Sequence, residues 1–203
     1  GLRYPPRFTQ VSTPEEATLA LQQQRFDLVI CMPGTDNSDA FDIGRGIKEH
    51  FPSTPIVVLT PFSHGITRYM ERQDLSLFEY VFCWLGNTEL LLSIIKLMED
   101  KMNLEHDIRE GGVQMILLVE DSIRFYSSVL PNLYKYVLEQ SRAFATEALN
   151  AHQATLRMRG RPKIVLARTY EEAWLLYDRY RNNTLGVISD VRFPMFEGGG
   201  KEA

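Results

Sequence analysis

Three acidic residues close to the ends of two short apolar stretches have the chemistry of a cation site. Glu120 and Asp121 directly follow the run Met115–Val119, and Asp190 lies near the end of the run Leu185–Val191. Mg²⁺ prefers oxygen ligands and binds through one or two carboxylates together with phosphate oxygens. Carboxylates that are brought together repel one another unless a cation neutralises them, and an Asp carboxylate can accept a phosphoryl group. We therefore expect these acids to form one Mg²⁺ site.

The two apolar stretches are expected to be strands of a parallel sheet. Each is short, almost wholly apolar and flanked by polar residues, which is typical of strands buried on both faces. Acids at the C-terminal ends of such strands lie at the edge where open α/β sheets bind ligands. The first hundred residues alternate strand and helix patterns, starting with a strand at residues 7–13. This alternation predicts an α/β fold with doubly wound parallel sheets.

A long helical pattern follows the acidic pair. Apolar or small residues recur at helical spacing over Ile123–Arg159, and Pro131 is the one turn signal inside it. The pattern predicts either one elongated helix kinked near Pro131 or two helices.

An internal repeat divides the chain. The sequence Thr-Pro-Glu-Glu-Ala at Thr13–Ala17 is matched by Thr-Tyr-Glu-Glu-Ala at Thr169–Ala173, and each motif begins a helix that leads into a buried strand. The first of these strands ends on Met32, whereas the second ends on Asp190. We therefore expect two copies of one α/β unit, of which only the second carries the acids.

The expected domains are residues 1–103, a polar linker over 104–114, and a second domain over 115–203 that stops after its third strand. The first copy lacks a central strand and the second lacks two others. Either the chain is a fragment, or the strand Met115–Val119 completes the first sheet in a permuted arrangement.

Composition limits the classes of partner. The chain has 203 residues, 44% of them hydrophobic and 24% charged, and a net charge of −4, which favours neither nucleic acid nor an anionic membrane as partner. Its apolar runs are too short to cross a bilayer, and its first residues lack the apolar core of a secretory leader. Cys31 and Cys83 have no metal-ligand spacing, so we expect buried thiols in a reducing, cytoplasmic compartment.

The motifs Ile116–Asp121 (Ile-Leu-Leu-Val-Glu-Asp) and Val187–Pro194 (Val-Ile-Ser-Asp-Val-Arg-Phe-Pro) resemble the first and third strands of response-regulator receiver domains. The resemblance implies a flavodoxin-like fold in two receiver-like units, the first degenerate. It also implies that Glu120, Asp121 and the backbone carbonyl of Arg192 bind Mg²⁺ beside Asp190, the phosphoacceptor. The order of the units is similar to the N-terminal regulatory region of bacterial phosphoenolpyruvate synthase-like proteins.

This resemblance implies a phosphoacceptor module of a two-component phosphorelay rather than a turnover enzyme. Its partners would be a histidine kinase or phosphotransfer protein and a linked C-terminal catalytic module, so that the parent protein would be a phosphotransferase. The first copy departs from the family pattern: Met32 replaces the acceptor and Cys83-Trp84 replaces Lys-Pro, although Thr60 matches the switch hydroxyl. The alternative is a pseudo-receiver scaffold that forms a homodimer or docks a downstream module through the long helix and its aromatic residues.

Three other motifs are weaker indications of function. Gly198–Lys201 lacks the spacing of a phosphate loop, and Arg159–Pro162 is expected to end a helix in a solvated turn rather than to bind a DNA minor groove. His152 could accept a phosphoryl group, as in phosphotransfer bundles, but a surface histidine is the simpler interpretation.

Overall fold

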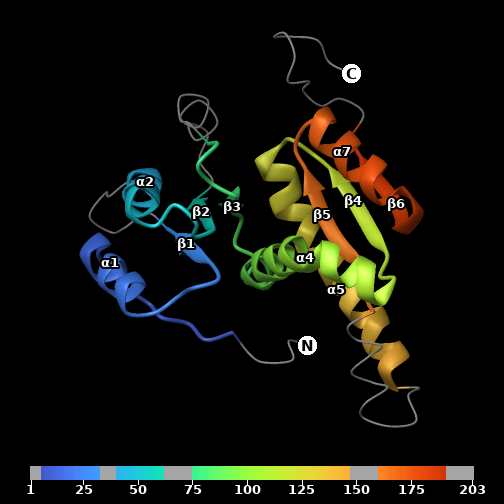
Figure 1. Cartoon of the computed structure of the whole chain (residues 1–203), viewed down its shortest axis with the longest axis horizontal. Coiled ribbons are helices and arrows are strands. Elements are labelled where there is room, and N and C mark those ends of the chain that lie inside the picture. The colour runs from blue at the N-terminus through green and yellow to red at the C-terminus, as the bar shows by residue number, and fades with distance from the viewer. Residues whose placement is uncertain (1–5, 33–39, 62–74, 147–159, 191–203) are drawn as a thin grey trace. The chain divides into compact units, whose positions relative to one another are not determined.

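The computed structural model describes residues 6–32, 40–61, 75–146 and 160–190 of the chain (Figure 1). They form two compact units, Leu2–Asn87 and Thr88–Ala203, and each unit has its own three-stranded parallel sheet. The predicted α/β class is therefore confirmed. Within the described ranges, no helix is both long enough and apolar enough to cross a membrane.

The first unit has a parallel sheet of strand order β1-β2-β3. Its described elements are α1 (Pro14–Gln23), β1 (Val29–Cys31), α2 (Ala40–His50), β2 (Ile56–Pro61) and β3 (Tyr80–Trp84). The Thr13 hydroxyl oxygen accepts a hydrogen bond from the Glu16 backbone N–H (3.2 Å), and Glu16 Oε2 accepts one from the Ser12 N–H (2.8 Å). These two hydrogen bonds cap the start of the helix and, with proline at its first position, explain why α1 begins at Pro14.

The strand predicted at residues 7–13 is wrong, because these residues form no strand and are largely exposed. In the second unit, the strand ahead of the repeated helix pairs with β4 (Met115–Val119). The described part of the first sheet contains no counterpart of β4. Among the described residues, 7–13 therefore lack the central partner strand that β5 has in the second unit, and strand propensity alone does not make them a strand.

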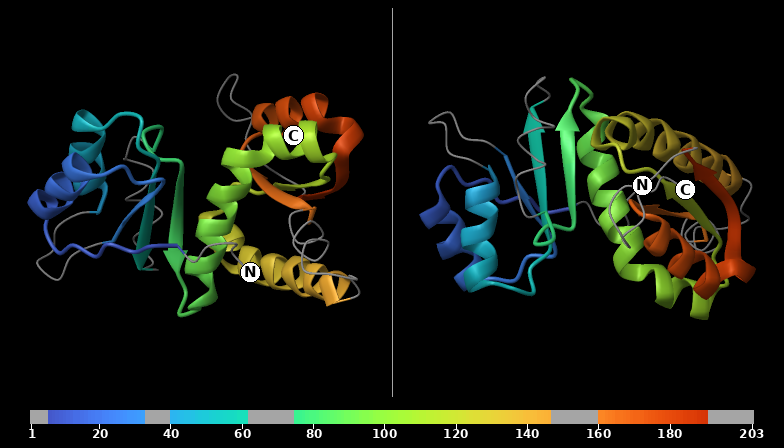
Figure 2. Two further views of the ribbon diagram at one scale, coloured as in Figure 1. Left: turned by 60° about the horizontal axis from the view of Figure 1, so that its bottom comes forward. Right: turned by 90° about the horizontal axis from the view of Figure 1, so that it is seen from above.

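The second unit has a parallel sheet of strand order β5-β4-β6, with β4 in the centre. Its other described elements are α4 (Glu89–Gly111), α5 (Ile123–Thr146), β5 (Lys163–Ala167), α7 (Tyr170–Tyr180), a 3-10 turn (Arg181–Asn183) and β6 (Thr184–Ser189). Helices α5 and α7 lie on opposite sides of this sheet (Figure 2). On the α7 side, Met115, Leu117 and Val119 form a buried core with neighbouring apolar residues of β5, α4 and α7.

Helix α4 corrects the predicted domain boundary. It runs without interruption to Gly111, where the linker over 104–114 was expected, and Gly112 ends it with φ of 59°. The helix packs against α5 and β5, and Leu104 joins the core of the second sheet. The boundary therefore precedes Thr88, because the helix buries its apolar residues in the second unit.

The elongated helix after the acidic pair is present as α5, which spans 24 residues and contains Pro131. Tyr126 and Tyr134 are buried on it, so these two aromatic side chains are core residues rather than a docking surface. The rest of the predicted helix, residues 147–159, lies outside the described residues.

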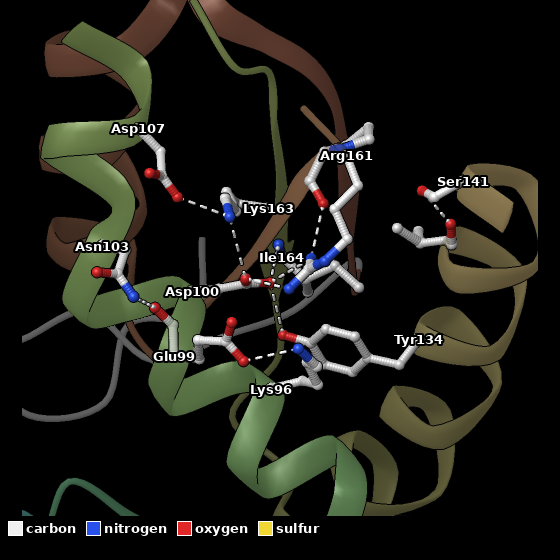
Figure 3. Close-up of polar contacts among 12 residues, drawn as sticks. Lys96, Glu99, Asp100, Asn103, Asp107, Tyr134, Ser141, Arg161, Lys163 and Ile164 are labelled. Atoms are coloured by element: carbon white, nitrogen blue, oxygen red, sulfur yellow. Dashed lines mark hydrogen bonds and ion pairs between the residues drawn. The ribbon is translucent and has the colours of Figure 1, made fainter. Parts of the chain in front are cut away.

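A buried carboxylate ties α4 to β5 and α5 (Figure 3). Asp100 on α4 is fully buried and accepts hydrogen bonds from both terminal nitrogens of Arg161 (2.9 and 2.5 Å). It also accepts hydrogen bonds from the Tyr134 hydroxyl (3.0 Å) and from the Ile164 backbone N–H (3.0 Å). The solvated turn expected at Arg159–Pro162 is therefore wrong for Arg161, which is 5% exposed.

Lys163 extends this buried cluster toward the end of α4. Its Nζ lies 2.7 Å from a carboxylate oxygen of Asp107 and 3.9 Å from one of Asp100. Two cations thus face two carboxylates, and the described hydrogen bonds satisfy Asp100 on both oxygens. Removing one partner from a buried ion cluster strongly destabilises a protein, because the remaining charges stay buried and unpaired.

We expect Asp100→Ala to lower the free energy of unfolding of the second unit by about 3–5 kcal/mol, because Arg161 would stay buried without a carboxylate. The matched control is Glu110→Ala, which removes an exposed ion pair with Arg109 on the same helix and should cost at most about 1 kcal/mol. Urea unfolding followed by circular dichroism measures both. Equal losses for the two variants would contradict this account of the cluster.

Candidate metal centre

Backbone pairing at the C-terminal ends of three strands positions the acids. In the parallel register, Val119 of β4 lies opposite Ala167 of β5 and Ser189 of β6. The ladder continues one residue further, because the Glu120 N–H donates to the Ala167 carbonyl (3.0 Å) and the Asp190 N–H donates to the Val119 carbonyl (3.1 Å). The backbones of Glu120 and Asp190 are therefore held side by side at one edge of the sheet.

The side chains of Glu120, Asp121 and Asp190 converge at this edge. One carboxylate oxygen from each residue lies within 4.8 Å of the other two. Glu120 is partly buried, whereas Asp121 and Asp190 are exposed. Three carboxylates from two strand ends fit the hard oxygen-donor set that divalent cations such as Mg²⁺ require, so this cluster could hold a metal ion.

The start of helix α5 borders the cluster. The Ser122 backbone N–H donates to Glu120 Oε1 (3.0 Å), and the Ser122 hydroxyl oxygen accepts a hydrogen bond from the Phe125 N–H (3.4 Å). The acids therefore lie next to the positive end of a long helix dipole, which favours negative charge. This neighbour offsets part of the repulsion among the carboxylates.

Burial and the neighbouring carboxylates disfavour the charged form of Glu120. Partial burial raises the pKa of Glu120 above its ordinary value, and the negative charges of Asp190 and Asp121 raise it further, although the Ser122 N–H opposes them. Each cause that raises the pKa penalises the charged carboxylate. A bound cation would remove that penalty, because it neutralises the neighbouring charges.

The sequence named further residues besides these three acids. Arg192, whose backbone carbonyl was expected to bind the metal, lies outside the described residues. In the first unit, Met32 follows β1 and is 54% exposed, and Thr60 is buried on β2. Cys31 and Cys83 are buried free thiols, as predicted, and burial raises the pKa of Cys31 to about 12.

An apolar groove beside the acids was not foreseen. It lies between α7 and the sheet, is lined by Val119, Ser189, Tyr170, Trp174 and Tyr177 among others, and has a volume of about 260 Å³. The spacing of the three aromatic residues along α7 was a usable signal, since residues three and four apart share a helix face. How exposed these three side chains are, however, depends on which other elements cover the sheet.

Comparison of the chain with protein-family models, with curated proteins and with solved structures returned no match. Function is therefore inferred from the geometry of the chain itself.

Glu120→Gln should make the stability of the metal-free protein less dependent on pH. A carboxyl whose pKa is raised by folding stabilises the protein below its ordinary pKa, and this contribution is lost as pH rises through the raised value. Glutamine keeps an oxygen that can accept the Ser122 hydrogen bond but carries no charge, so the variant should be the more stable protein at neutral pH.

Urea unfolding with a chelator present, between about pH 4 and pH 7, measures this effect. Glu49→Gln, which alters an exposed carboxylate of the first unit, is the control and should follow the parent protein. A Glu120→Gln curve parallel to that of the parent would show that the repulsion is unimportant.

Proposed function

We propose that the second unit is a receiver-type phosphoacceptor module of a two-component phosphorelay. Asp190 would accept the phosphoryl group, and Glu120 and Asp121 would hold Mg²⁺ beside it. The observation that carries this proposal is the convergence of three carboxylates within 4.8 Å at the C-terminal edge of a parallel sheet. Ligands of open α/β sheets bind at this edge.

The strand order supports the finer, flavodoxin-like assignment. In chain order the strands of this unit are β4, β5 and β6, and in space they run β5-β4-β6. A flavodoxin-like sheet begins with the spatial order second-first-third, and its ligand site lies between the first and third strands. Here the corresponding strands are β4 and β6, which carry the acids at their ends.

The chemistry is a transfer between two nucleophiles. A carboxylate oxygen of Asp190 attacks the phosphorus, a new P–O bond forms, and the P–N bond of a phosphohistidine breaks as its imidazole leaves. With acetyl phosphate as donor, a P–O bond breaks and acetate leaves. Mg²⁺ would neutralise the phosphoryl oxygens and the acids, and the partly buried Glu120 would fix its position.

The donor follows from the same chemistry. A histidine kinase or a histidine phosphotransfer protein supplies a phosphoryl group on nitrogen, and an aspartate accepts it. The module would then control a linked catalytic module related to phosphoenolpyruvate synthase. The chain itself would be an acceptor rather than a turnover enzyme.

A second candidate function is a pseudo-receiver scaffold that docks or dimerises without being phosphorylated. One observation favours it: the second unit presents exposed apolar side chains on α7 and β6.

Beryllofluoride with Mg²⁺ tests the first function in the full chain, because it mimics a phosphoryl group on an aspartate. We expect Mg²⁺-dependent binding with a rise in melting temperature, and a phosphoryl mass shift with acetyl phosphate. Asp190→Asn should lose both, since an amide is not a nucleophilic carboxylate. Asp27→Asn, an exposed residue of the first unit, should behave as the parent protein.

A mass shift that survives in Asp190→Asn would overturn the assignment of the acceptor. No binding and no shift in the parent protein would favour the scaffold.

A further inference from the structure

The two copies of the repeated sequence differ by one strand. The repeat aligns Thr13–Ala17 with Thr169–Ala173. In the second unit, β5 precedes this motif, β6 follows its helix, and β4 pairs with both strands. In the described part of the first unit, no strand pairs with both the segment before α1 and the strand β1 after it. The position that β4 holds in the second sheet therefore has no described occupant in the first.

The repeat also shows which residues of the first unit would flank such a strand. The offset of the helix motif, 156 residues (169 − 13), aligns Arg7–Val11 with β5. Met32 and Asp190 directly follow the two buried strands, so β1 corresponds to Val187–Ser189 of β6. We therefore expect Arg7–Val11 on one side of the missing strand and β1 on the other.

Both of these flanking segments lack cover. Phe8 is 74% exposed, whereas every residue of β5 is buried. Among the described strands β1 pairs only with β2, and its residues Val29 and Ile30 are half-buried. Arg7–Val11 and β1 do not pair with each other either. The first sheet thus has an apolar strand whose outer edge is unpaired, and such an edge is a template for another strand.

Helix α1 is loosely packed for the same reason. It packs mainly against α2 and has no buried residue (Figure 1). In the second unit, α7 packs against β4 and β5 and buries Ala173 in the core. Ala17, the counterpart of Ala173, is only half-buried. Because most helices in proteins are stabilised by burying an apolar face, α1 would gain stability from a strand that packs against it.

The second unit indicates what kind of strand fits. There β4 is wholly apolar, four of its five residues are buried, and it runs parallel to both neighbours. Its residues Leu117–Val119 lie opposite Val187–Ser189. The same register in the first unit would place three residues of the added strand opposite Val29–Cys31. These residues must be apolar, because a central strand of a parallel sheet is buried on both faces.

We propose that the first unit binds an extended apolar segment of another polypeptide as an added parallel strand between Arg7–Val11 and β1. Main-chain hydrogen bonds to β1 supply affinity, and the apolar side chains of the guest segment supply specificity. Strand β4 of the same chain is not that segment, because it is already paired on both edges in the second sheet. This proposal does not depend on metal binding or phosphorylation.

A peptide with the sequence of Val113–Asp121, extended by two lysines for solubility, tests the proposal on the full chain. Hydrogen exchange followed by mass spectrometry should show slower exchange of the amides of Arg7–Val11, α1 and β1 when this peptide is added. The control peptide carries Leu117→Pro, which removes a ladder N–H from the middle of the strand and should bind at least about tenfold more weakly.

Two variants of the protein locate the site. Phe8→Asp should bind the peptide at least about tenfold more weakly, because binding would bury an unpaired carboxylate. Phe8 is exposed in the free chain, so this variant should unfold at the same urea concentration as the parent protein. Leu175→Asp makes a similar change at an exposed residue of the second unit and should bind as the parent does. Fluorescence anisotropy of the labelled peptide measures these affinities.

Four results would overturn the proposal. The first is no protection of Arg7–Val11 and β1 at any soluble concentration of the peptide. The second is protection confined to β6, the edge of the second sheet. The third is equal binding by Phe8→Asp and Leu175→Asp. The fourth is protection that appears only when the same strand is fused ahead of Gly1, which would assign the site to a covalently joined strand rather than to another polypeptide.

Discussion

The parallel pairing of β4 with both of its neighbours is the constraint on which the second unit depends. Because β5 and β6 pair with β4 in parallel, all three strands end at one edge of the sheet. The last ladder bonds, from Glu120 to Ala167 and from Asp190 to Val119, fix the backbone of the acids rather than their side chains. The carboxylates therefore converge as a consequence of strand register, and a slip of one residue would turn them to the other face of the sheet.

The buried Asp100 cluster lies at the start of β5, at the opposite end of that strand from the acids. It joins α4 to the start of β5, through Arg161, Lys163 and the Ile164 N–H, whereas the acids lie at the strand ends. The cluster therefore sets where β5 begins, and the pairing with β4 sets where it ends. A charged cluster in this position costs desolvation energy, and we infer that its value lies in fixing one packing of α4 rather than in added stability.

The parts of this structure that could be predicted from the sequence are those that local pattern determines. The strand Met115–Val119 was visible because a short apolar run ends abruptly on two acids, and the repeat linked α1 with α7. The helical extension to Gly111 was missed because its polar residues and the two glycines resemble a linker until Leu104 and Asp107 find partners in the second unit. The burial of Arg161 was missed for the same reason, since its partner Asp100 is distant in the sequence.

The acidic cluster was the easier part of the candidate site, because strand ends and carboxylates are both local features. Its environment was not, since the raised pKa of Glu120 depends on burial and on two neighbouring charges that only the fold brings together. The apolar face of α7 was likewise visible as a row of aromatic residues, but its exposure is a tertiary property. The residue types at the strand ends thus predict the kind of site, whereas the burial and the charges around that site follow from tertiary packing.

The most direct test of the central claim is the binding of Mn²⁺, a paramagnetic substitute for Mg²⁺, followed by electron paramagnetic resonance of the free ion. We expect one site in the full chain that is weakened by substitution directly after β4 (Glu120→Gln or Asp121→Asn) and also directly after β6 (Asp190→Asn), because all three carboxylates share it. Binding that is unchanged in Asp190→Asn would contradict a shared site, since the residue after β6 would then play no part in it.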